Sequence, residues 1–280
     1  MRLARVGGAL VLIAVLAATL PLVAAPYSPT QQDIRNLLRP PSAVHPLGTD
    51  ELGRDTLTRV MVGAQASLEV GILAVGISLV VGCAIGLVAG YLRGPSDATL
   101  MRIMDGLLAL PTLVLALAIT AMLGPSLNNA MLAIGVTGVP VFARLVRGQV
   151  LSVREQDFVQ AARSLGAGHL RMLMQHILPN VLSSIVVQAS LAMPAAILAE
   201  AGLSFLGLGV QPPTPSWGAM LNTAKGYLQQ DAWLALAPGV ALFVTVLGFN
   251  FLGDALRDAL DPRLASATVR QTSVTPRPNR

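Results

Sequence analysis

Six long apolar stretches constrain the fold of this 280-residue chain more than any other feature of its sequence. A helix needs about 20 mostly apolar residues to cross the hydrocarbon core of a bilayer. The stretches that approach or exceed this length are residues 6–25, 67–91, 103–123, 129–146, 181–201 and 233–252. The sequence therefore predicts a polytopic membrane protein with six transmembrane segments.

Composition indicates which kind of membrane fold the stretches form. Hydrophobic residues make up 54% of the chain, charged residues only 12%, and the mean hydropathy is +0.66, outside the usual range of soluble domains. Aromatic residues are only 4%, whereas a transmembrane β-barrel carries aromatic girdles at both interfaces. We therefore expect an all-α fold.

The first apolar stretch allows two interpretations. Arg2 and Arg5 precede it, and Val23-Ala24-Ala25 resembles the cleavage site of a secretory signal peptide. However, the apolar run is longer than that of a usual signal peptide, and Pro26 would directly follow the cut. We favour a retained membrane anchor.

Basic residues predict the orientation, because cytoplasmic loops of membrane proteins carry an excess of Lys and Arg. Of the 19 basic residues, five fall in the loops on one side: Arg35, Arg39, Arg54, Arg59 and Lys225. The others fall on the side of the termini: Arg2, Arg5, Arg93, Arg102, Arg144, Arg147, Arg154, Arg163, Arg171, Arg257, Arg263, Arg270, Arg277 and Arg280. Both termini should therefore be cytoplasmic, and the net charge of +5 needs no nucleic-acid partner.

These predictions divide the chain into four parts. Residues 1–25 form an N-terminal transmembrane anchor, and residues 26–66 an extracytoplasmic loop with a short helix. Residues 67–265 form the transmembrane domain of five spans, and residues 266–280 a disordered cytoplasmic tail. Four spans carry one proline each, at Pro111, Pro140, Pro194 and Pro238, which predicts either hinges or static kinks.

One polar segment interrupts the apolar pattern: residues 160–180 read QAARSLGAGHLRMLMQHILPN. Apolar residues recur at i, i+3, i+4 and i+7, first from Phe158 to Leu165 and again from Leu170 to Ile177, as in two short amphipathic helices. The glycine at Gly166 can end the first helix, and Pro179 is expected to mark the turn into the next span. Such a helix pair either docks a partner or lies on lipid head groups.

This segment resembles the EAA loop of ABC importer permeases, which has Glu-Ala-Ala, three residues, Gly, and a closing Ile-x-Leu-Pro. Six residues fall at these spacings: Gln160, Ala161, Ala162, Gly166, Leu178 and Pro179. Two positions depart, because Gln160 replaces the Glu and His176 occupies the Ile position. The resemblance implies that residues 150–180, the coupling segment, dock a cytoplasmic ATPase through Gln160, Ala161, Ala162, Arg163, Gly166, Ala167 and Leu170.

Three further blocks narrow the resemblance: HPLGTDELGRDTLTRV from His45, LSFLGLGVQPPTPSWG from Leu203 and FNFLGDALRDALDPR from Phe249. They are similar to the second permease subunit of peptide-type ABC importers, the dipeptide, oligopeptide and nickel group. The family implies a prokaryotic inner-membrane subunit that pairs with a homologous permease, two ATPase subunits and an extracytoplasmic binding protein. Dipeptides or short oligopeptides are the expected cargo, with nickel chelates, opines and haem-like compounds as alternatives.

No catalytic or metal site is predicted. The chain lacks a G-x-x-x-x-G-K-S/T phosphate-binding loop, so ATP and Mg²⁺ would be used by the partner subunits, and we expect no cofactor bound by this chain. The three histidines, His45, His169 and His176, are dispersed and show no metal-ligand spacing. We therefore expect a transport component and no enzyme.

Two rival functions remain at this point. An ion-coupled carrier would be expected to place carboxylates within the membrane, yet Glu69, Asp105, Glu200 and Asp254 all fall near span ends. A membrane scaffold that transports nothing would need no proline-hinged spans. The EAA-like segment favours the importer over both.

Two of these carboxylates are candidates for the transport pathway. Asp105 could face Arg144 or Arg147 and hold an inner gate, and Glu200 could attract a peptide amine at the outer mouth. The simpler alternative is that both stabilise the helix bundle.

The loop after the first span contains Gly48-Thr49-Asp50 and Gly53-Arg54-Asp55. Long outer loops often dock partners, and the resemblance implies a binding protein on this side, so Asp50, Arg54 and Asp55 are candidate contacts. Alternatively, Asp50 and Asp55 cap a short helix over residues 56–64.

Overall fold

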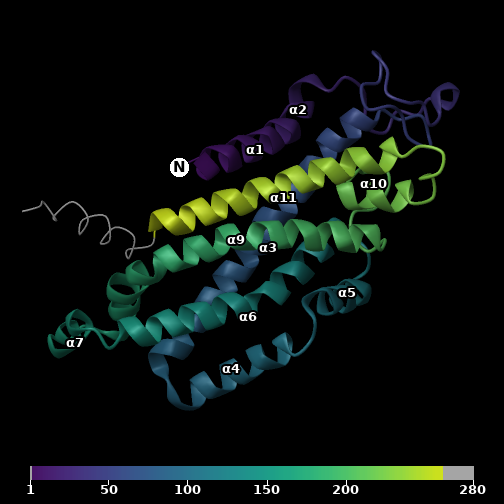
Figure 1. The fold of residues 1–280 in the computed structure, drawn as a ribbon. Helices are drawn as coiled ribbons and strands as arrows, with labels where there is room; N and C mark the ends of the chain where they lie inside the picture. Colours follow the sequence, from purple (N-terminus) through teal and green to yellow (C-terminus); the bar gives the residue numbers. More distant parts are fainter. Residues whose placement is uncertain (1, 261–280) are drawn as a thin grey trace, which may run out of the picture.

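The computed structural model describes residues 2–260, and all regular structure in that range is helical apart from one antiparallel bridge between Thr49 and Asp55. The long helices run back and forth along a common axis, and the loops gather at the two ends (Figure 1). The predicted all-α membrane fold is confirmed. The predicted tail at 266–280, and Arg263, Arg270, Arg277 and Arg280, lie outside the described residues.

The first span consists of α1 (Arg2–Thr19) and the short α2 (Pro21–Ala24). Helix α1 packs against α11 (Trp233–Leu260) through glycines on both helices. A Cβ atom at Gly7 would lie 2.7 Å from the backbone nitrogen of Leu252, and one at Gly248 would lie 2.8 Å from the Cβ of Leu10. The first stretch is thus a close-packed member of the bundle, and its retention as an anchor stays a prediction.

Helix α3 (Thr56–Leu92) corrects two boundaries of the sequence analysis. The short helix predicted over residues 56–64 and the span predicted over residues 67–91 are one continuous helix of 37 residues. Its length is about 55 Å, whereas the hydrocarbon core is about 30 Å thick. Polar residues between the two segments end the apolar run but do not end the helix, so hydropathy misplaced its start.

The centre of the bundle is the contact between α3 and α6 (Leu127–Val153). Three glycines spaced by four residues, Gly82, Gly86 and Gly90, line this contact on α3. A Cβ at Gly86 would lie 2.6 Å from the carbonyl oxygen of Ala143. Small residues at this spacing let membrane helices approach until their backbones touch. Pro140 lies within α6, and Pro194 and Pro238 also lie inside helices.

The predicted third span is not one straight helix. It is divided into α4 (Gly94–Leu108) and α5 (Thr112–Leu123), which meet at an angle of 90°. Pro111 lacks a backbone N–H and disfavours a helical conformation at Leu110, so the helix stops before it and restarts after it. The structure therefore has five long apolar helices in the described range, or six spans if this bent pair counts as one.

The coupling segment also differs from its prediction. Its first helix is α7 (Asp157–Ser164), as expected. The second is not separate, because α8 (His169–Arg171) and the π-helical η2 (Met172–Ile177) continue directly into α9 (Leu178–Phe205). Pro179 falls in the first turn of α9, where a missing N–H is tolerated, and wider π-type hydrogen bonding precedes it. The predicted turn at Pro179 is wrong.

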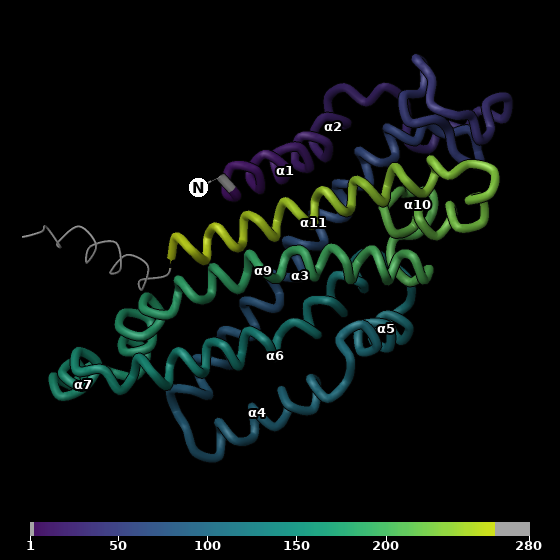
Figure 2. The backbone as a smooth tube through the Cα atoms, in the orientation of Figure 1, coloured from purple at the N-terminus to yellow at the C-terminus, as the bar shows by residue number. Residues whose placement is uncertain are grey.

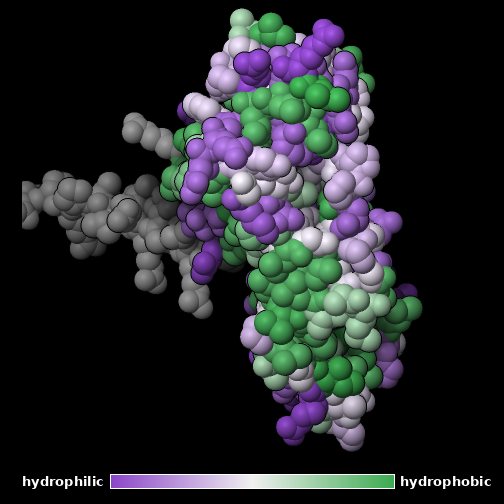
Figure 3. All heavy atoms as spheres, turned by 90° about the vertical axis from the view of Figure 1, so that its right-hand side faces the viewer, coloured by the Kyte–Doolittle hydropathy of each residue, from purple (hydrophilic) through white to green (hydrophobic). Residues whose placement is uncertain are grey.

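The two ends of the bundle have different contents. The N-terminal end of α1, the C-terminal end of α11 and α7 lie at one end (Figure 2). The other end holds the loop of residues 26–55 with η1 (Ile34–Asn36), and α10 (Trp217–Ala224). Seen from that end, hydrophilic and hydrophobic side chains mix over the loop, and hydrophobic ones dominate lower down (Figure 3).

Candidate functional site

Helix α7 ends in a hydrogen-bonded turn that only glycine adopts readily. The N–H of Gly166 donates to the carbonyl of Arg163 at 3.0 Å, and the N–H of Ala167 donates to that of Ala162 at 3.1 Å. Gly166 has a φ of +80°, and no atom lies within 4 Å of where its Cβ would be. The need for glycine is therefore conformational, as the sequence predicted for this position.

Val159 attaches α7 to the rest of the chain. It is buried and belongs to the same apolar cluster as Met172 and Ile177. The sequence analysis placed the apolar face one residue earlier, at Phe158, which the structure leaves exposed. The i, i+3 spacing of Val159 and Ala162 is the signal in the sequence that marks the buried face.

The coupling segment presents apolar side chains at the end of the bundle. Leu165 is 89% exposed and Leu170 is 70% exposed, and Phe158 and Met174 are exposed as well. Of the predicted docking residues, Gln160, Ala161, Arg163, Gly166 and Leu170 are exposed, whereas Ala162 and Ala167 are partly buried against the protein's own core. Side chains of this kind at a loop surface mark a site of protein–protein or membrane contact.

The C-terminal end of α3 holds the coupling segment in place. The hydroxyl of Tyr91 and Nδ1 of His169 lie 2.8 Å apart, and the two rings meet edge to face. Arg154, at the end of α6, donates from Nη1 to the carbonyl of Tyr91 at 2.9 Å. A guanidinium there satisfies a terminal carbonyl that has no partner within the helix. The sequence analysis did not identify Tyr91.

Two ion pairs join α4 to α6. Arg144 donates from Nη2 to Oδ1 of Asp105 at 2.5 Å, so Asp105 faces Arg144 and not Arg147. Arg147 instead binds Asp97 through two hydrogen bonds of 2.5 and 2.7 Å. Asp97, which the sequence analysis missed, lies eight residues before Asp105 and thus on the same side of α4. A gating role for Asp105 stays a prediction.

Glu200 lies apart from these pairs and is fully buried near the other end of α9. Ser204 donates to its carboxyl at 2.7 Å and Ser67 of α3 at 3.2 Å. The hydroxyl of Ser204 also accepts the backbone N–H of Val210. Glu200 therefore ties α3, α9 and the following loop together from inside the protein, whereas its proposed position at an outer mouth would need exposure.

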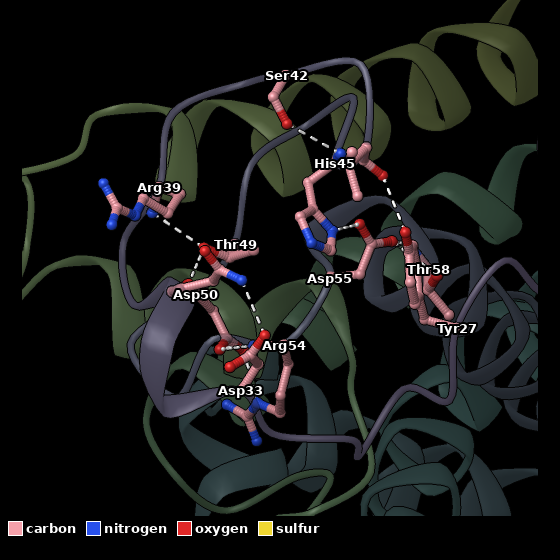
Figure 4. Close-up of polar contacts among 12 residues, drawn as sticks. Tyr27, Asp33, Arg39, Ser42, His45, Thr49, Asp50, Arg54, Asp55 and Thr58 are labelled. Carbon is pink, nitrogen blue, oxygen red and sulfur yellow. Dashed lines mark hydrogen bonds and ion pairs between the residues drawn. The ribbon is translucent and has the colours of Figure 1, made fainter.

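Asp50 organises the long loop (Figure 4). Its Oδ1 accepts the backbone N–H groups of Leu52 and Arg54 at 2.9 Å, and its Oδ2 accepts Nε of Arg54 at 2.6 Å. Arg59 of α3 approaches the same Oδ2 at 3.2 Å. Asp50 thus contacts two buried arginines, one of which, Arg54, also pairs with Glu51 at 2.6 Å, and Asp50 does not cap α3 as the alternative prediction held.

Asp55 does cap α3, as predicted. Its Oδ2 accepts the N–H of Thr58 at 2.8 Å, and its Oδ1 lies 2.9 Å from Nδ1 of His45. Asp50, Arg54 and Asp55 are only 2%, 7% and 3% exposed. These three buried side chains stabilise the loop. A binding protein would therefore contact the surface of the loop and not these side chains.

Glycines set the path of this loop. Gly48 and Gly53 have φ values of +75° and +73°. A Cβ at Gly48 would lie 2.4 Å from the carbonyl oxygen of Arg39, and one at Gly53 would lie 1.9 Å from that of Asp33. Both the backbone conformation and the close approach therefore require glycine.

Two carboxyls of the loop have perturbed pKa values. The backbone N–H of Arg35 and the side-chain amide of Asn36 bind the carboxylate of Asp33 and lower its pKa. Burial, followed by the nearby charge of Asp50, raises the pKa of Glu51.

Within residues 2–260, no group of three or more His, Cys, Asp or Glu side chains is arranged to hold a metal ion.

Known proteins share most of this sequence. Residues 82–266 match the family described as the binding-protein-dependent transport system inner membrane component. The dipeptide transport system permease protein DppC of Alkalihalophilus pseudofirmus is 48% identical over 245 residues, which cover 88% of this chain and 80% of that protein. The di/tripeptide permease protein DppC of Pseudomonas aeruginosa is 47% identical, with coverage of 87% and 82%. The glutathione permease protein GsiD of Escherichia coli is 46% identical, with coverage of 86% and 80%.

Solved structures share the fold at lower identity. A chain of the MetNI methionine ABC transporter in an inward-facing conformation aligns with a TM-score of 0.60 at 19% identity, covering 72% of this chain and 96% of that one. A chain of an amino acid ABC transporter aligns with a TM-score of 0.57 at 19% identity, covering 72% and 94%. The helical arrangement is thus that of ABC transporter membrane subunits. From the family match, the relatives and the apolar helices, this chain is a multi-pass membrane protein, a transport component and not an enzyme, and it belongs to the family of binding-protein-dependent transport system inner membrane components.

Proposed function

We propose that this chain is a permease subunit of an ATP-driven importer of dipeptides and short oligopeptides. It would pair with a homologous permease to form the translocation pathway, and two ATPase subunits would drive alternating access. An extracytoplasmic binding protein would deliver the cargo. The observation that carries the proposal is the apolar surface of the coupling segment, with Leu165 and Leu170 exposed at the end of the bundle.

The structure supports a route by which an ATPase could move the spans. The coupling segment is bound to α3 through His169 and Tyr91, and α8 continues through η2 into α9 without a break. A displacement of residues near Leu170 would therefore act directly on two long helices. Because packed helices shift as units, a small movement at the segment can change the exposure of the pathway at the other end.

Peptide cargo is supported by the names of the relatives. Dipeptides, di/tripeptides and glutathione are the substrates in the names of three proteins that are 46% to 48% identical to this chain. Glutathione is itself a modified tripeptide, so all three cargoes share peptide bonds. Nickel chelates are the alternative cargo, and competition between the two in an uptake assay separates them.

The orientation is proposed from the distribution of charge. The end of the bundle that carries the coupling segment also holds Arg93, Arg144, Arg147, Arg154 and Arg163, and by the positive-inside rule these charges support a cytoplasmic location for this end. The loop of residues 26–55 and α10 would then face the binding protein. Asp50, Arg54 and Asp55 would contribute by holding the shape of that surface.

Copurification tests the proposal. The tagged chain is purified in mild detergent from its native membrane, and the proteins that accompany it are identified by mass spectrometry. Leu170→Glu changes the proposed docking surface, and Leu228→Glu, at an exposed leucine between α10 and α11, is the matched control. Gly166→Pro additionally removes the turn at the end of α7.

The wild type and Leu228→Glu should bring a second permease and ATPases, and Leu170→Glu and Gly166→Pro should lose the ATPases at least tenfold while keeping the second permease. Recovery of the chain alone or as a homo-oligomer would contradict the importer proposal. Uptake that persists with inactive ATPases would indicate a carrier, and a complete complex without uptake of any solute would indicate a scaffold.

A further inference from the structure

Helix α9 borders two adjoining cavities that none of the sites above uses. One, of about 720 Å³, lies between α6, α9 and α11 towards the end that carries the coupling segment. The other, of about 240 Å³, lies between α3, α5, α6 and α9. Gln188 and Leu191 line both cavities, so together they form one groove along α9. We call this the α9 groove.

A single face of α9 lines the groove from end to end. Its lining residues include Asn180, Ser184, Gln188, Leu191, Ala195 and Ala199. Successive members are spaced by three or four residues, which keeps them on one side of an α-helix. The 19 helical steps from Asn180 to Ala199 rise about 28 Å, close to the thickness of the hydrocarbon core of about 30 Å. The groove is therefore as long as a path across the membrane.

The polar residues of this face are not suited to lipid. Among the described residues, the side chains of Ser183, Ser184 and Gln188 form no hydrogen bond with another group. An amide without a partner in hydrocarbon costs several kcal/mol. The opposite face of the same helix instead exposes Leu182 and Val186, which lipid accommodates. The groove side of α9 must therefore face water or another polar molecule.

The charge of the groove indicates its ligand. Of the described residues that line the two cavities, Arg257 alone is charged, and it lies at the end near the coupling segment. The rest of the polar lining consists of amides and hydroxyls, including Gln149, Ser184 and Gln188. Amides donate and accept hydrogen bonds, as peptide backbones do, without selecting for side-chain charge. A volume of about 720 Å³ is within the range of small-molecule sites.

The ion pairs between α4 and α6 lie away from this groove. On α6 the residues that line the two cavities include Gly138, Val141, Leu145 and Gln149. Neither Arg144 nor Arg147 lines either cavity, and their side chains instead bind Asp105 and Asp97 of α4. A molecule in the groove would thus meet the amides of α6 and α9 and not these arginines.

We propose that the α9 groove is this chain's half of the substrate pathway and that Gln188, near its middle, hydrogen-bonds the peptide backbone of the cargo. This inference rests on the proposed function, because the second permease would close the groove from the open side. Gln188 would then bind the backbone that all peptides share, whatever the side chains of the peptide. Ser184 and Gln149 extend the same chemistry towards the inner end.

Thiol labelling in the assembled complex tests the path. Cys83, the single cysteine, is first changed by Cys83→Ala, and Ser184→Cys, Gln188→Cys and Ala195→Cys are then introduced one at a time. Leu182→Cys and Val186→Cys on the opposite face are the matched controls. Maleimides react with the thiolate, which forms in water and not in lipid, so a membrane-impermeant maleimide in membrane vesicles of both orientations reports on a water-filled path.

The three groove variants should label at least tenfold faster than the two controls, and L-alanyl-L-alanine together with the binding protein and ATP should slow the labelling of Gln188→Cys. Equal labelling of both faces in a complex that still transports would overturn the pathway and leave the proposed function intact. Labelling of Gln188→Cys that the transported dipeptide does not slow would overturn the role of Gln188.

Uptake of L-alanyl-L-alanine gives a second readout. Gln188→Leu should reduce uptake at least tenfold while the ATPases remain bound, and Val186→Leu should change it less than twofold. Unchanged uptake by Gln188→Leu contradicts the contact. Failure of the wild-type chain to bring ATPases is a different result, because it contradicts the proposed function itself.

Discussion

The hydroxyl oxygen of Tyr91, at the end of α3, lies 2.8 Å from Nδ1 of His169 at the start of α8. This hydrogen bond crosses 78 residues of sequence and joins the central helix of the bundle to the coupling segment. His169 begins the continuous helix that becomes α9, so both helices that meet here extend deep into the bundle. The contact is therefore positioned to pass movement of the coupling segment to α3.

Tyr91→Phe removes this hydrogen bond and keeps the edge-to-face contact of the rings. We expect a loss of stability of about 1 kcal/mol, as for a single neutral hydrogen bond. The larger effect should be on coupling, with at least a twofold increase in ATP hydrolysed per peptide transported. An unchanged ratio in reconstituted vesicles would mean that the contact is only structural.

Gly86→Val tests the backbone contact of α3 with α6. Its Cβ would lie 2.6 Å from the carbonyl oxygen of Ala143, so the helices must separate at a cost of about 1–3 kcal/mol or more. Gly76→Val is the matched control, because nothing lies within 4 Å of a Cβ there. The unfolding midpoint in detergent should fall for the first variant only, and equal midpoints would contradict the packing described.

Asp50→Asn should destabilise the long loop strongly. It leaves Arg54 and Arg59, both buried, without their shared carboxylate, and breaking a buried ion pair typically costs about 3 kcal/mol or more. Limited proteolysis of intact vesicles should cut the loop of the variant at least tenfold faster than that of the wild type. Resistance equal to that of the wild type would show that Asp50 does not organise the loop.

Although Glu51 is paired with Arg54, it predicts a pH dependence of opposite sign to that of a carboxylate whose pKa is lowered in the folded state. Burial raises its pKa from the ordinary value of 4.5, so its ionisation opposes folding. The stability that its protonated form contributes is present below pH 4.5 and is lost as the pH rises through the higher pKa of the folded state. Glu51→Gln should therefore gain stability relative to the wild type as the pH rises from about 4.5 to 7. A difference in unfolding midpoint that does not change with pH would contradict this.

Asp105→Asn tests whether the ion pair between Asp105 and Arg144 gates transport or only stabilises the contact between α4 and α6. The pair with Arg144 is half exposed, and such pairs contribute about 1 kcal/mol or less to stability. Because neither Asp105 nor Arg144 lines the α9 groove, we expect peptide uptake within twofold of the wild type. A tenfold change in uptake with normal assembly of the complex would instead support the gate.

Much of the fold follows from local sequence. Apolar stretches of sufficient length indicate that the chain crosses a membrane. These stretches cross as helices, because within lipid a helix satisfies all of its own backbone hydrogen bonds. Gly166 and Asp55 were placed correctly, since a left-handed helix end and an N-cap are interactions within a few residues. The same local reasoning failed at Pro179, where the neighbouring residues adopt π-type hydrogen bonds and the helix continues.

What only the tertiary structure decided is which side chains meet. Asp105 had two candidate arginines, and the crossing of α4 and α6 paired it with Arg144 and supplied Asp97 for Arg147. Asp50 was a candidate contact for a binding protein and Glu200 a candidate for an outer mouth, yet packing buries both side chains. The sequence determined a helical membrane transport component, since apolar length and short motifs are local properties. The pairing of charges and the groove along α9 depend on how whole helices cross, which no local pattern specifies.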